Sequence, residues 1–496
     1  MKKALTIGTL LIVGGAAAAA PYMIGAHVEK EYHNQLEQML AKTGQSPGIE
    51  FKIDRYERSY RTATAYISMT VDTKDLQQPP APGMPAIPES ISITMKSEIE
   101  HGPLISGAPS PLTLAKFVST FELSDEFKEI ERFYFKDKPF FTDTAYLEKD
   151  GTSTSVMVIP PYHGPSHDQS AAIKWDGLSG TTSANWLNLS SKMDLSTPLL
   201  QVTMGDINVT MKAASASADN WFSPQDIALG KISAGISELN ISGPGPAGPQ
   251  AGMTLTNLRV DGAADQNGTL INGFQEIGFE QLQAGTEPFK NGVIRIELNN
   301  LDALTISKLQ QKLQTQANSP GPNTDPAVVM NMMLSELQAT LPELLKHSPE
   351  LLISKVGVEN SDGVIAGRLK LALQPTDQFN PEMGLLAMIP LLNIELDLSA
   401  PVATVTTLAN SMADGQVRAQ LAAQQQVMEE AEIKQQSQMV AQQMLQMGLQ
   451  QHFIQQNGED FTVRLRFKNG ELLLNGQPSE QLINMLMGAA APNSGA

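Results

Sequence analysis

The sequence predicts an α+β protein that is predominantly β, built from long antiparallel meandering sheets with a few helices. Three observations predict this fold class. Apolar and polar residues alternate with a period of two in many segments, short turn signals join such segments directly, and few helical patterns separate them. One apolar face and one polar face per strand are typical of antiparallel sheets that are covered on one side.

The first element is an N-terminal segment of the Sec type. Lys2 and Lys3 form a basic start, and Ala4–Ala26 is uncharged and long enough to span a bilayer core of about 30 Å. This predicts an uncleaved anchor with the lysines on the cytoplasmic side. The alternative is a cleaved signal, because Leu5–Val13 precedes a run of small residues, although Pro21 disfavours cleavage directly before it. The predicted anchor includes Ala4, Leu10, Val13, Ala20, Tyr22 and Ala26.

Both alternatives export the chain. We therefore expect a protein of the bacterial inner membrane with its body in the periplasm, or a periplasmic protein if the signal is cleaved. Residues 27–46 follow as a predicted stalk helix that lifts the body off the bilayer. Val28, Tyr32 and Leu36 recur there at helical spacing, and Gly44 ends the pattern.

The body is predicted to contain two β-rich domains, residues 47–241 and 253–487, joined by the Pro- and Gly-rich linker Ser242–Gly252. Asn469-Gly470 and Asp362-Gly363 are two-residue signals for β-hairpins. Strict alternation marks the clearest strands, which are Ile91–Met95, Ile294–Leu298, Ile365–Leu373, Ile394–Leu398 and Val463–Phe467.

Helical patterns lie mainly in the second half of the chain. Asp325 is a predicted cap for Pro326–Thr340, after a second linker at Asn318–Pro326, and Ser479 is a predicted cap for Glu480–Met487. Asn410–Gln456 reads as a long helix rich in glutamine and methionine. Residues 488–496 are expected to form a flexible tail.

Composition excludes several classes of protein. The net charge of −18 repels phosphate backbones, so we expect no nucleic-acid partner. The absence of cysteine excludes disulfides, thiolate nucleophiles, iron–sulfur clusters and lipoprotein attachment.

Several short motifs occur in a fixed order along the chain. Tyr56-Glu57-Arg58-Ser59-Tyr60 comes first, followed by His101-Gly102-Pro103-Leu104, by Leu344–Gly363, and by Gly470–Gly476, which contains Asn475. In this order the chain resembles the YdgA-like family of bacterial envelope proteins over essentially its whole length. That family usually has Gly and Trp where this chain has Ser59 and Tyr60. The resemblance implies location and architecture, because the family has no assigned activity. The motif residues are Tyr56, Arg58, Tyr60, His101, Gly102, Pro103, Leu104, Asn475 and Gly476.

The usual signatures of enzymes are missing from the sequence, including H-E-x-x-H, G-x-S-x-G and a P-loop. His163, His167 and Asp168 could hold a metal, but Gly164 and Pro165 prevent helical alignment, which favours a solvated loop. His101 could be catalytic, although a His-Gly-Pro turn more often uses its ring to bond nearby backbone. We therefore expect no enzyme, no catalytic residue, no cofactor and no metal.

The remaining function classes are an assembly protein and a binding protein. We expect a non-enzymatic scaffold of the cell envelope, tethered to the inner membrane by its N-terminal helix. The alternative is a lipid- or apolar-ligand-binding protein with a curved-sheet groove. A second apolar stripe within Asn410–Gln456 predicts a homodimer, unless another part of the same chain covers it. Its predicted interface residues are Val440, Met444, Met447 and Ile454.

Overall fold

The structure of the 496-residue chain is a computed structural model. It describes residues 20–34, 37, 49–72, 90–123, 125–136, 138–185, 187–245, 248–284, 287–317, 336, 340–376, 389–423 and 428–479. Several predictions lie outside these residues: Ala4, Leu10 and Val13 of the anchor, the second linker, most of the helix at Pro326–Thr340, the helix at Glu480–Met487, and the tail.

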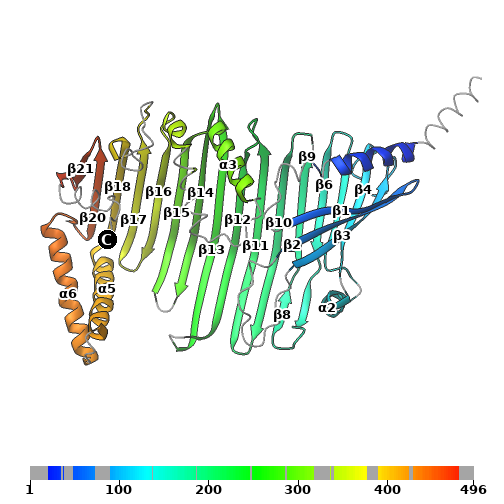
Figure 1. Ribbon diagram of the computed structural model, residues 1–496. Coiled ribbons are helices and arrows are strands. Elements are labelled where there is room, and N and C mark those ends of the chain that lie inside the picture. Colours follow the sequence, from blue (N-terminus) through cyan, green and yellow to red (C-terminus); the bar gives the residue numbers. More distant parts are fainter. Residues whose placement is uncertain are drawn as a thin grey trace, which may run out of the picture. The chain divides into compact units, whose positions relative to one another are not determined.

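The chain forms two compact units. The N-terminal unit comprises residues 1–244 and 310–323, and the C-terminal unit comprises residues 245–309 and 324–496. In both units the described strands pair antiparallel and mostly with their neighbours in sequence (Figure 1). The predicted fold class, a mainly antiparallel β protein with few helices, is therefore confirmed.

In the N-terminal unit, ten strands run in the order β1-β2-β3-β4-β5-β6-β9-β10-β11-β12. β7 (Tyr162–Pro165) and β8 (Ala172–Trp175) form a short extra hairpin that pairs with the end of β10. The helix α2 (Asp125–Phe135) connects β4 to β5. The ten strands are β1 (Ile49–Arg58), β2 (Thr62–Asp72), β3 (Ser90–His101), β4 (Thr113–Glu122), β5 (Thr142–Glu148), β6 (Thr152–Ile159), β9 (Leu178–Asn185), β10 (Ser190–Met204), β11 (Ile207–Phe222) and β12 (Ala228–Gly245).

The N-terminal helix covers residues 20–34 and lies against the first strands of this sheet (Figure 1). The prediction of a stalk standing away from the body is therefore wrong for residues 27–34. The apolar stripe through Val28 and Tyr32 explains the difference, because it packs on the sheet of the same chain. Within the described part of the chain, no helix is both long and apolar enough to cross a membrane.

The C-terminal unit contains a sheet in the order β13-β14-β15-β16-β17-β18-β20-β21-β22, with β19 (Gln455–Asn457) paired to β20. The helix α3 (Ala303–Ala317) begins directly after β15. The sheet strands are β13 (Gly248–Asn267), β14 (Leu270–Ala284), β15 (Glu287–Asp302), β16 (Glu350–Asn360), β17 (Gly363–Leu373), β18 (Leu392–Pro401), β20 (Asp460–Lys468), β21 (Glu471–Leu474) and β22 (Gln477–Pro478).

The predicted linker Ser242–Gly252 contains the boundary between the two compact units, which falls between Pro244 and Gly245. β12 extends to Gly245 and β13 begins at Gly248, so strands occupy most of this segment. The hairpin prediction at Asn469-Gly470 is confirmed, because φ is 53° at Asn469 and 78° at Gly470 and Lys468 pairs with Glu471.

The long helix predicted at Asn410–Gln456 is two helices. α5 (Val402–Ala423) and α6 (Glu430–Gln450) form an antiparallel hairpin inserted between β18 and β20. Ala409, Ala413 and Ala441 form its contact, and their small side chains allow the helices to approach closely.

Candidate functional site

Three motif residues of the N-terminal unit, Tyr56, Arg58 and His101, meet where the N-terminal helix packs on the sheet. Pro21, Gly25 and Val28 are buried and lie on one stripe of the helix. Val28 is 1% exposed and packs against strand residues with mostly small side chains. These strand residues are Ala63, Ala65, Ile99, Ala115 and Leu147. Alanine at three of these positions lets the helix backbone come close to the sheet.

His101, at the end of β3, lies directly beneath this helix and is fully buried. A Cβ atom added at Gly25 would lie 2.8 Å from Cδ2 of the His101 ring, so the ring packs on the bare helix backbone. Neither ring nitrogen has a hydrogen-bond partner in the described structure. The expectation that the ring bonds nearby backbone is therefore wrong. Burial, and then the neighbouring Arg58 guanidinium, lowers the pKa of His101.

Gly102 and Pro103 form the turn after His101. The N–H of Gly102 donates to the carbonyl of Leu114, and a Cβ atom at Gly102 would lie 2.5 Å from the carbonyl oxygen of Thr113. Glycine is therefore required at this position by a close approach of two backbones. The turn points Leu104 outwards, where it is 79% exposed.

Arg58 joins the end of β1 to the N-terminal helix. Its guanidinium lies 2.9 Å from the Glu29 carboxylate, donates to the carbonyl of Tyr22 at 3.1 Å, and lies 4.6 Å from the centre of the Tyr22 ring. Tyr56, two residues earlier, packs against Tyr32 with ring centres 5.6 Å apart. Burial raises the pKa of Tyr32 to about 12. Arg58 and Tyr56 thus hold the helix on the sheet.

The remaining motif residues do not share this location. Tyr60 lies in the turn between β1 and β2 and is half-exposed. Asn475 and Gly476 belong to the C-terminal unit. The Asn475 side chain accepts from the N–H of Arg464 and donates to the carbonyl of His452, both at 2.7 Å, so it fastens the segment after α6 to β20.

His163, His167 and Asp168 do not converge. His163 pairs with Asp176 at 3.0 Å, the ring of His167 packs on Phe133, and Asp168 accepts hydrogen bonds from Ser166 and Ser170. These bonds lower the pKa of Asp168 to about 2. Among the described residues, no three His, Asp or Glu side chains are gathered as a metal would require.

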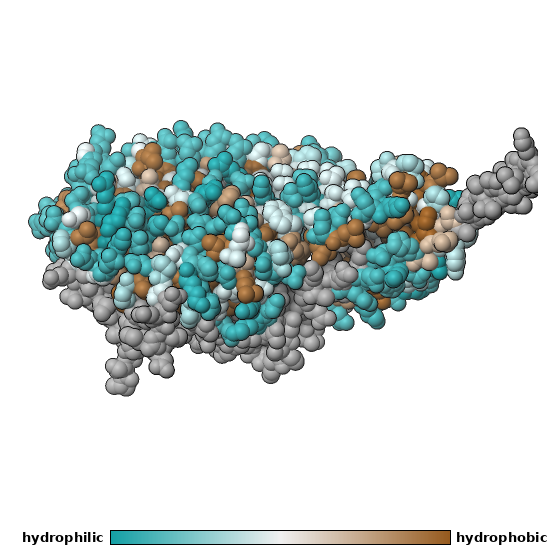
Figure 2. Space-filling model, turned by 90° about the horizontal axis from the view of Figure 1, so that it is seen from above, coloured by the Kyte–Doolittle hydropathy of each residue, from teal (hydrophilic) through white to brown (hydrophobic). Residues whose placement is uncertain are grey.

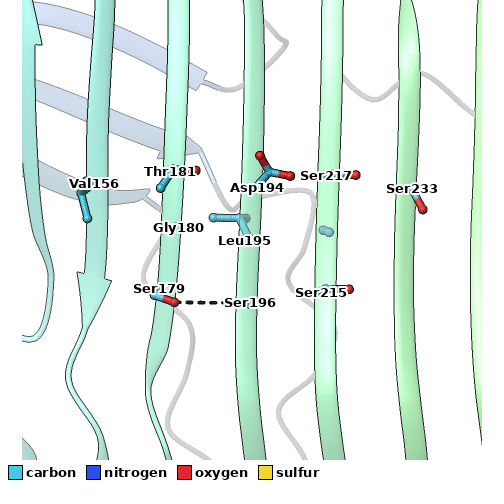
Figure 3. A pocket seen from close by; sticks show the side chains of 11 residues that line it. Val156, Ser179, Gly180, Thr181, Asp194, Leu195, Ser196, Ser215, Ser217 and Ser233 are labelled. Atoms are coloured by element: carbon cyan, nitrogen blue, oxygen red, sulfur yellow. Dashed lines mark hydrogen bonds between the residues drawn. The ribbon is translucent and has the colours of Figure 1, made fainter.

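A shallow depression of about 440 Å³ lies on the sheet of the N-terminal unit (Figure 3). Small hydroxyl side chains line it in register across four strands, and Ser179 and Ser196 lie 3.2 Å apart. The labelled lining includes Ser179, Thr181, Asp194, Ser196, Ser215, Ser217 and Ser233. This surface lacks the aromatic or basic side chains that would select a ligand.

The C-terminal unit has a sheet with one apolar face. Side chains of the same orientation meet in register across β14 to β21 and form three rows, here called the apolar face. The first row is Ile277, Ile294, Val356, Leu398 and Val463. The second is Ile296, Ile353, Leu369, Leu396, Leu465 and Leu474. The third is Leu298, Leu351, Leu371, Ile394, Phe467 and Leu472.

Burial of the apolar face changes across the sheet. Phe467, Leu472 and Leu474 at one end are at most 5% exposed. Other parts of the face are more open, with exposures of 45% at Leu398 on β18 and, on β15, of 36% at Ile294 and 47% at Leu298. Gly292 extends this part of the face, because the ring of Phe279 lies over the position that its Cβ would occupy. Several large aliphatic side chains of the apolar face are therefore partly open to solvent.

The opposite side of the same sheet carries ion pairs, and is here called the charged face. Glu276 contacts Arg259 at 3.1 Å and Arg295 at 3.5 Å, and Arg466 forms a two-pronged contact with Asp397 at 2.9 and 3.0 Å. Lys370 pairs with Glu350. The charged side chains named here are therefore paired with one another, whereas several aliphatic side chains of the apolar face stay exposed to solvent.

The predicted dimer interface is only partly available. Val440 packs towards the α5 contact within the same chain, and Ile454 lies beyond the end of α6 at Gln450, against Gly448. The two cannot share one continuous helical stripe. Met444 and Met447 do remain open, at 36% and 50% exposure.

Sequence reasoning identified Arg58, Tyr56 and His101 by their motifs but missed Gly25 and Glu29, their partners on the helix. The signal for those two was weak, because a glycine in a predicted membrane helix has many explanations. The apolar face was visible only as separate alternating strands, since register between strands cannot be read from one sequence.

Two comparisons with known proteins agree with the motif order. Residues 1–480 match the family described as "Bacterial protein of unknown function (DUF945)". The chain is also 19% identical to Protein YdgA of Escherichia coli (strain K12) over 510 aligned positions, which cover 96% of this chain and 94% of that protein. Because the family match covers nearly the whole sequence, the chain belongs to this family of bacterial proteins of unknown function.

Proposed function

We propose that this chain is a non-enzymatic binding protein of the bacterial cell envelope, and that the apolar face of its C-terminal unit holds the acyl chains of a lipid. The observation that carries the proposal is the exposure of that face. Ile277, Ile294, Ile296, Leu298 and Leu398 are each 36% to 47% exposed on one side of one sheet. Covering them removes apolar surface from water, which favours any apolar ligand that fits.

The dimensions of the apolar face suit an acyl chain. Neighbouring strands lie about 4.8 Å apart, so the stretch from β14 to β18 is roughly 19 Å wide. One lipid tail extends over about 15 Å, half of a bilayer core of about 30 Å. A tail lying across the strands would contact Ile277, Ile294 and Val356 in turn. Rows of branched aliphatic side chains offer no hydrogen bonds, which suits a hydrocarbon and not a polar ligand.

The proposal places the protein at the inner membrane, with its body in the periplasm. The support comes from the sequence before Ala26 and from the exposed groups around the start of the N-terminal helix. Figure 2 shows hydrophobic residues gathered there. Tyr22 and Met23 are 55% and 68% exposed, and Leu104 and Leu112 of the connection after β3 are 79% and 65% exposed. Aromatic and aliphatic groups of this kind favour a membrane interface.

A binding titration with a fluorescent fatty acid, cis-parinaric acid, tests the proposal on the delipidated full-length chain. We expect saturable binding that the double change Ile296→Glu and Leu298→Glu abolishes, since it places two carboxylates in the second and third rows. Val364→Glu is the matched control. It replaces an exposed aliphatic residue of the same sheet, but on the charged face.

Equal binding by the wild type and the double variant would contradict the proposal, provided that both have the same circular dichroism spectrum. So would an equal loss of binding in Val364→Glu, because that change leaves the apolar face intact.

A second candidate function is that of an assembly scaffold, and the α5–α6 hairpin favours it. Leu408 and Met412 on α5 are both 59% exposed, and Met444 and Met447 on α6 are also open. With about 100° per residue, these four lie on the same flank of the antiparallel pair. Methionine-rich surfaces adapt readily to a partner helix. In this proposal the partner is a second copy of the chain.

Light scattering on the purified protein tests the scaffold proposal. We expect a dimer that becomes a monomer when Leu408 and Met444 are both replaced by glutamate, while Met439→Glu leaves it dimeric. Met439 is the control because it is exposed on α6 but lies away from this flank. A wild-type monomer would refute the proposal.

A further inference from the structure

A second cavity lies in the N-terminal unit. It has a volume of about 340 Å³ and opens between α2 and the ends of β3 and β4. Aromatic rings dominate its walls, and they come from β4, from α2 and from the segment that follows α2. These rings belong to Phe121, Phe127, Tyr134, Phe135 and Phe140. A cavity of this size is in the range that holds a small organic molecule.

Packing among the rings fixes the walls. Phe121 and Phe140 are stacked, with ring centres 5.4 Å apart and planes 16° apart. The hydroxyl of Tyr134 accepts a hydrogen bond from the N–H of His167 at 2.9 Å, which anchors that ring from outside. Phe127 is 54% exposed and stands at the rim. Contacts among its own side chains therefore hold the walls of the cavity in place.

The charges at the cavity have one sign. Glu122 and Glu131 are among its lining residues, and none of the described lining residues is basic. Glu131 accepts a hydrogen bond from the N–H of Phe140 at 2.8 Å, which holds its carboxylate at the cavity wall. The faces of aromatic rings also carry negative potential. Rings and carboxylates together attract a positive charge on an apolar body.

We propose that this cavity binds a small organic cation, such as a quaternary or alkyl ammonium group on an apolar body. The ring faces contact the apolar body and the ammonium by cation–π interaction, while Glu122 and Glu131 supply the opposite charge. An anion fits this lining poorly, because Glu122 and Glu131 would repel a negative charge. The site is independent of the apolar face, so either proposal can fail alone.

The probe for this site is phenyltrimethylammonium, titrated into the full-length protein and followed by saturation-transfer NMR. N,N-dimethylaniline has nearly the same shape but is neutral at pH 7.5, and benzoate carries the opposite charge. We expect the cation to bind about tenfold more tightly than the neutral probe. A cation–π contact together with a nearby carboxylate accounts for a difference in affinity of this size. Benzoate should not bind.

Variants assign the binding to this cavity. We expect Phe127→Ala, which alters the exposed rim, and the pair Glu122→Gln with Glu131→Gln to weaken binding of phenyltrimethylammonium by about fivefold each. Glu129→Gln, a charge change on α2 outside the lining, should leave it unchanged. Equal affinity for the cation and the neutral probe would overturn the proposal, as would binding that persists unchanged in both variants.

Discussion

His101 and Gly25 share one packing position between the sheet and the N-terminal helix. A side chain at Gly25 must displace the ring, because its Cβ atom would lie 2.8 Å from Cδ2 of His101. We expect Gly25→Val to destabilise the N-terminal unit by about 1–3 kcal/mol, as overpacking of a filled core does. The three tryptophans, at positions 175, 186 and 221, all lie in this unit, so urea unfolding followed by tryptophan fluorescence reports on it.

The matched control combines Gly25→Val with His101→Ala. If the two side chains compete for one space, the double variant loses less stability than the sum of the single variants, with a coupling of about 1 kcal/mol. Additive losses would mean that the helix does not pack on His101.

A pH dependence follows from the same residue. The folded protein holds the pKa of His101 below its usual value, so the unfolded chain takes up a proton first as the pH falls below about 6.5. The stabilisation is full above that pH and is lost as the pH falls towards the folded pKa, by up to about 1.4 kcal/mol for each pH unit in that window. His101→Leu should flatten this profile and be tolerated at pH 7, because neither ring nitrogen has a described partner. If stability depended on pH in the same way in the wild type and in His101→Leu, His101 would not be the source of this dependence.

At the scale of elements, the closing hairpin of the C-terminal unit is the clearest case of a turn fixed by its residues. Both Asn469 and Gly470 have positive φ, and the flanking strands β20 and β21 pair directly. We expect Gly470→Val to cost about 1–2 kcal/mol, since a β-branched residue is unfavourable in the left-handed region. Hydrogen exchange of residues 463–474 measures the effect. Gly458→Val, at another turn glycine of positive φ, is the comparison, and should leave exchange at β21 unchanged.

The elements also show which patterns can be read from a sequence. Alternation predicted the strands at Ile294–Leu298 and Ile394–Leu398 because one face of each meets apolar neighbours and the other meets charges. The helix break between α5 and α6 was missed, because the residues between Ala423 and Glu430 have no proline or glycine to mark it. The prolines and glycines of Ser242–Gly252 marked the boundary between the two units, but they did not show that β12 and β13 extend into this segment.

At the scale of the molecule, the motif residues have a structural explanation. Arg58, Tyr56 and His101 hold the N-terminal helix on its sheet, and Asn475 fastens the segment after α6 to β20. None of them lines the apolar face or the cavity between α2 and the ends of β3 and β4. Sequence motifs therefore located the scaffold of the fold, whereas the candidate binding surfaces emerge only when strands are paired in register, because the side chains that form them come from distant segments.

The proposed function depends on whether the apolar face is occupied by lipid. The most direct measurement is mass spectrometry of an organic extract of the protein as purified, with the lipid quantified against the protein. We expect about one lipid per chain or more in the wild type and in Val364→Glu, and a loss in the Ile296→Glu and Leu298→Glu double variant. No lipid in the wild-type extract, or the same amount in the double variant, would contradict the proposal that the apolar face holds acyl chains.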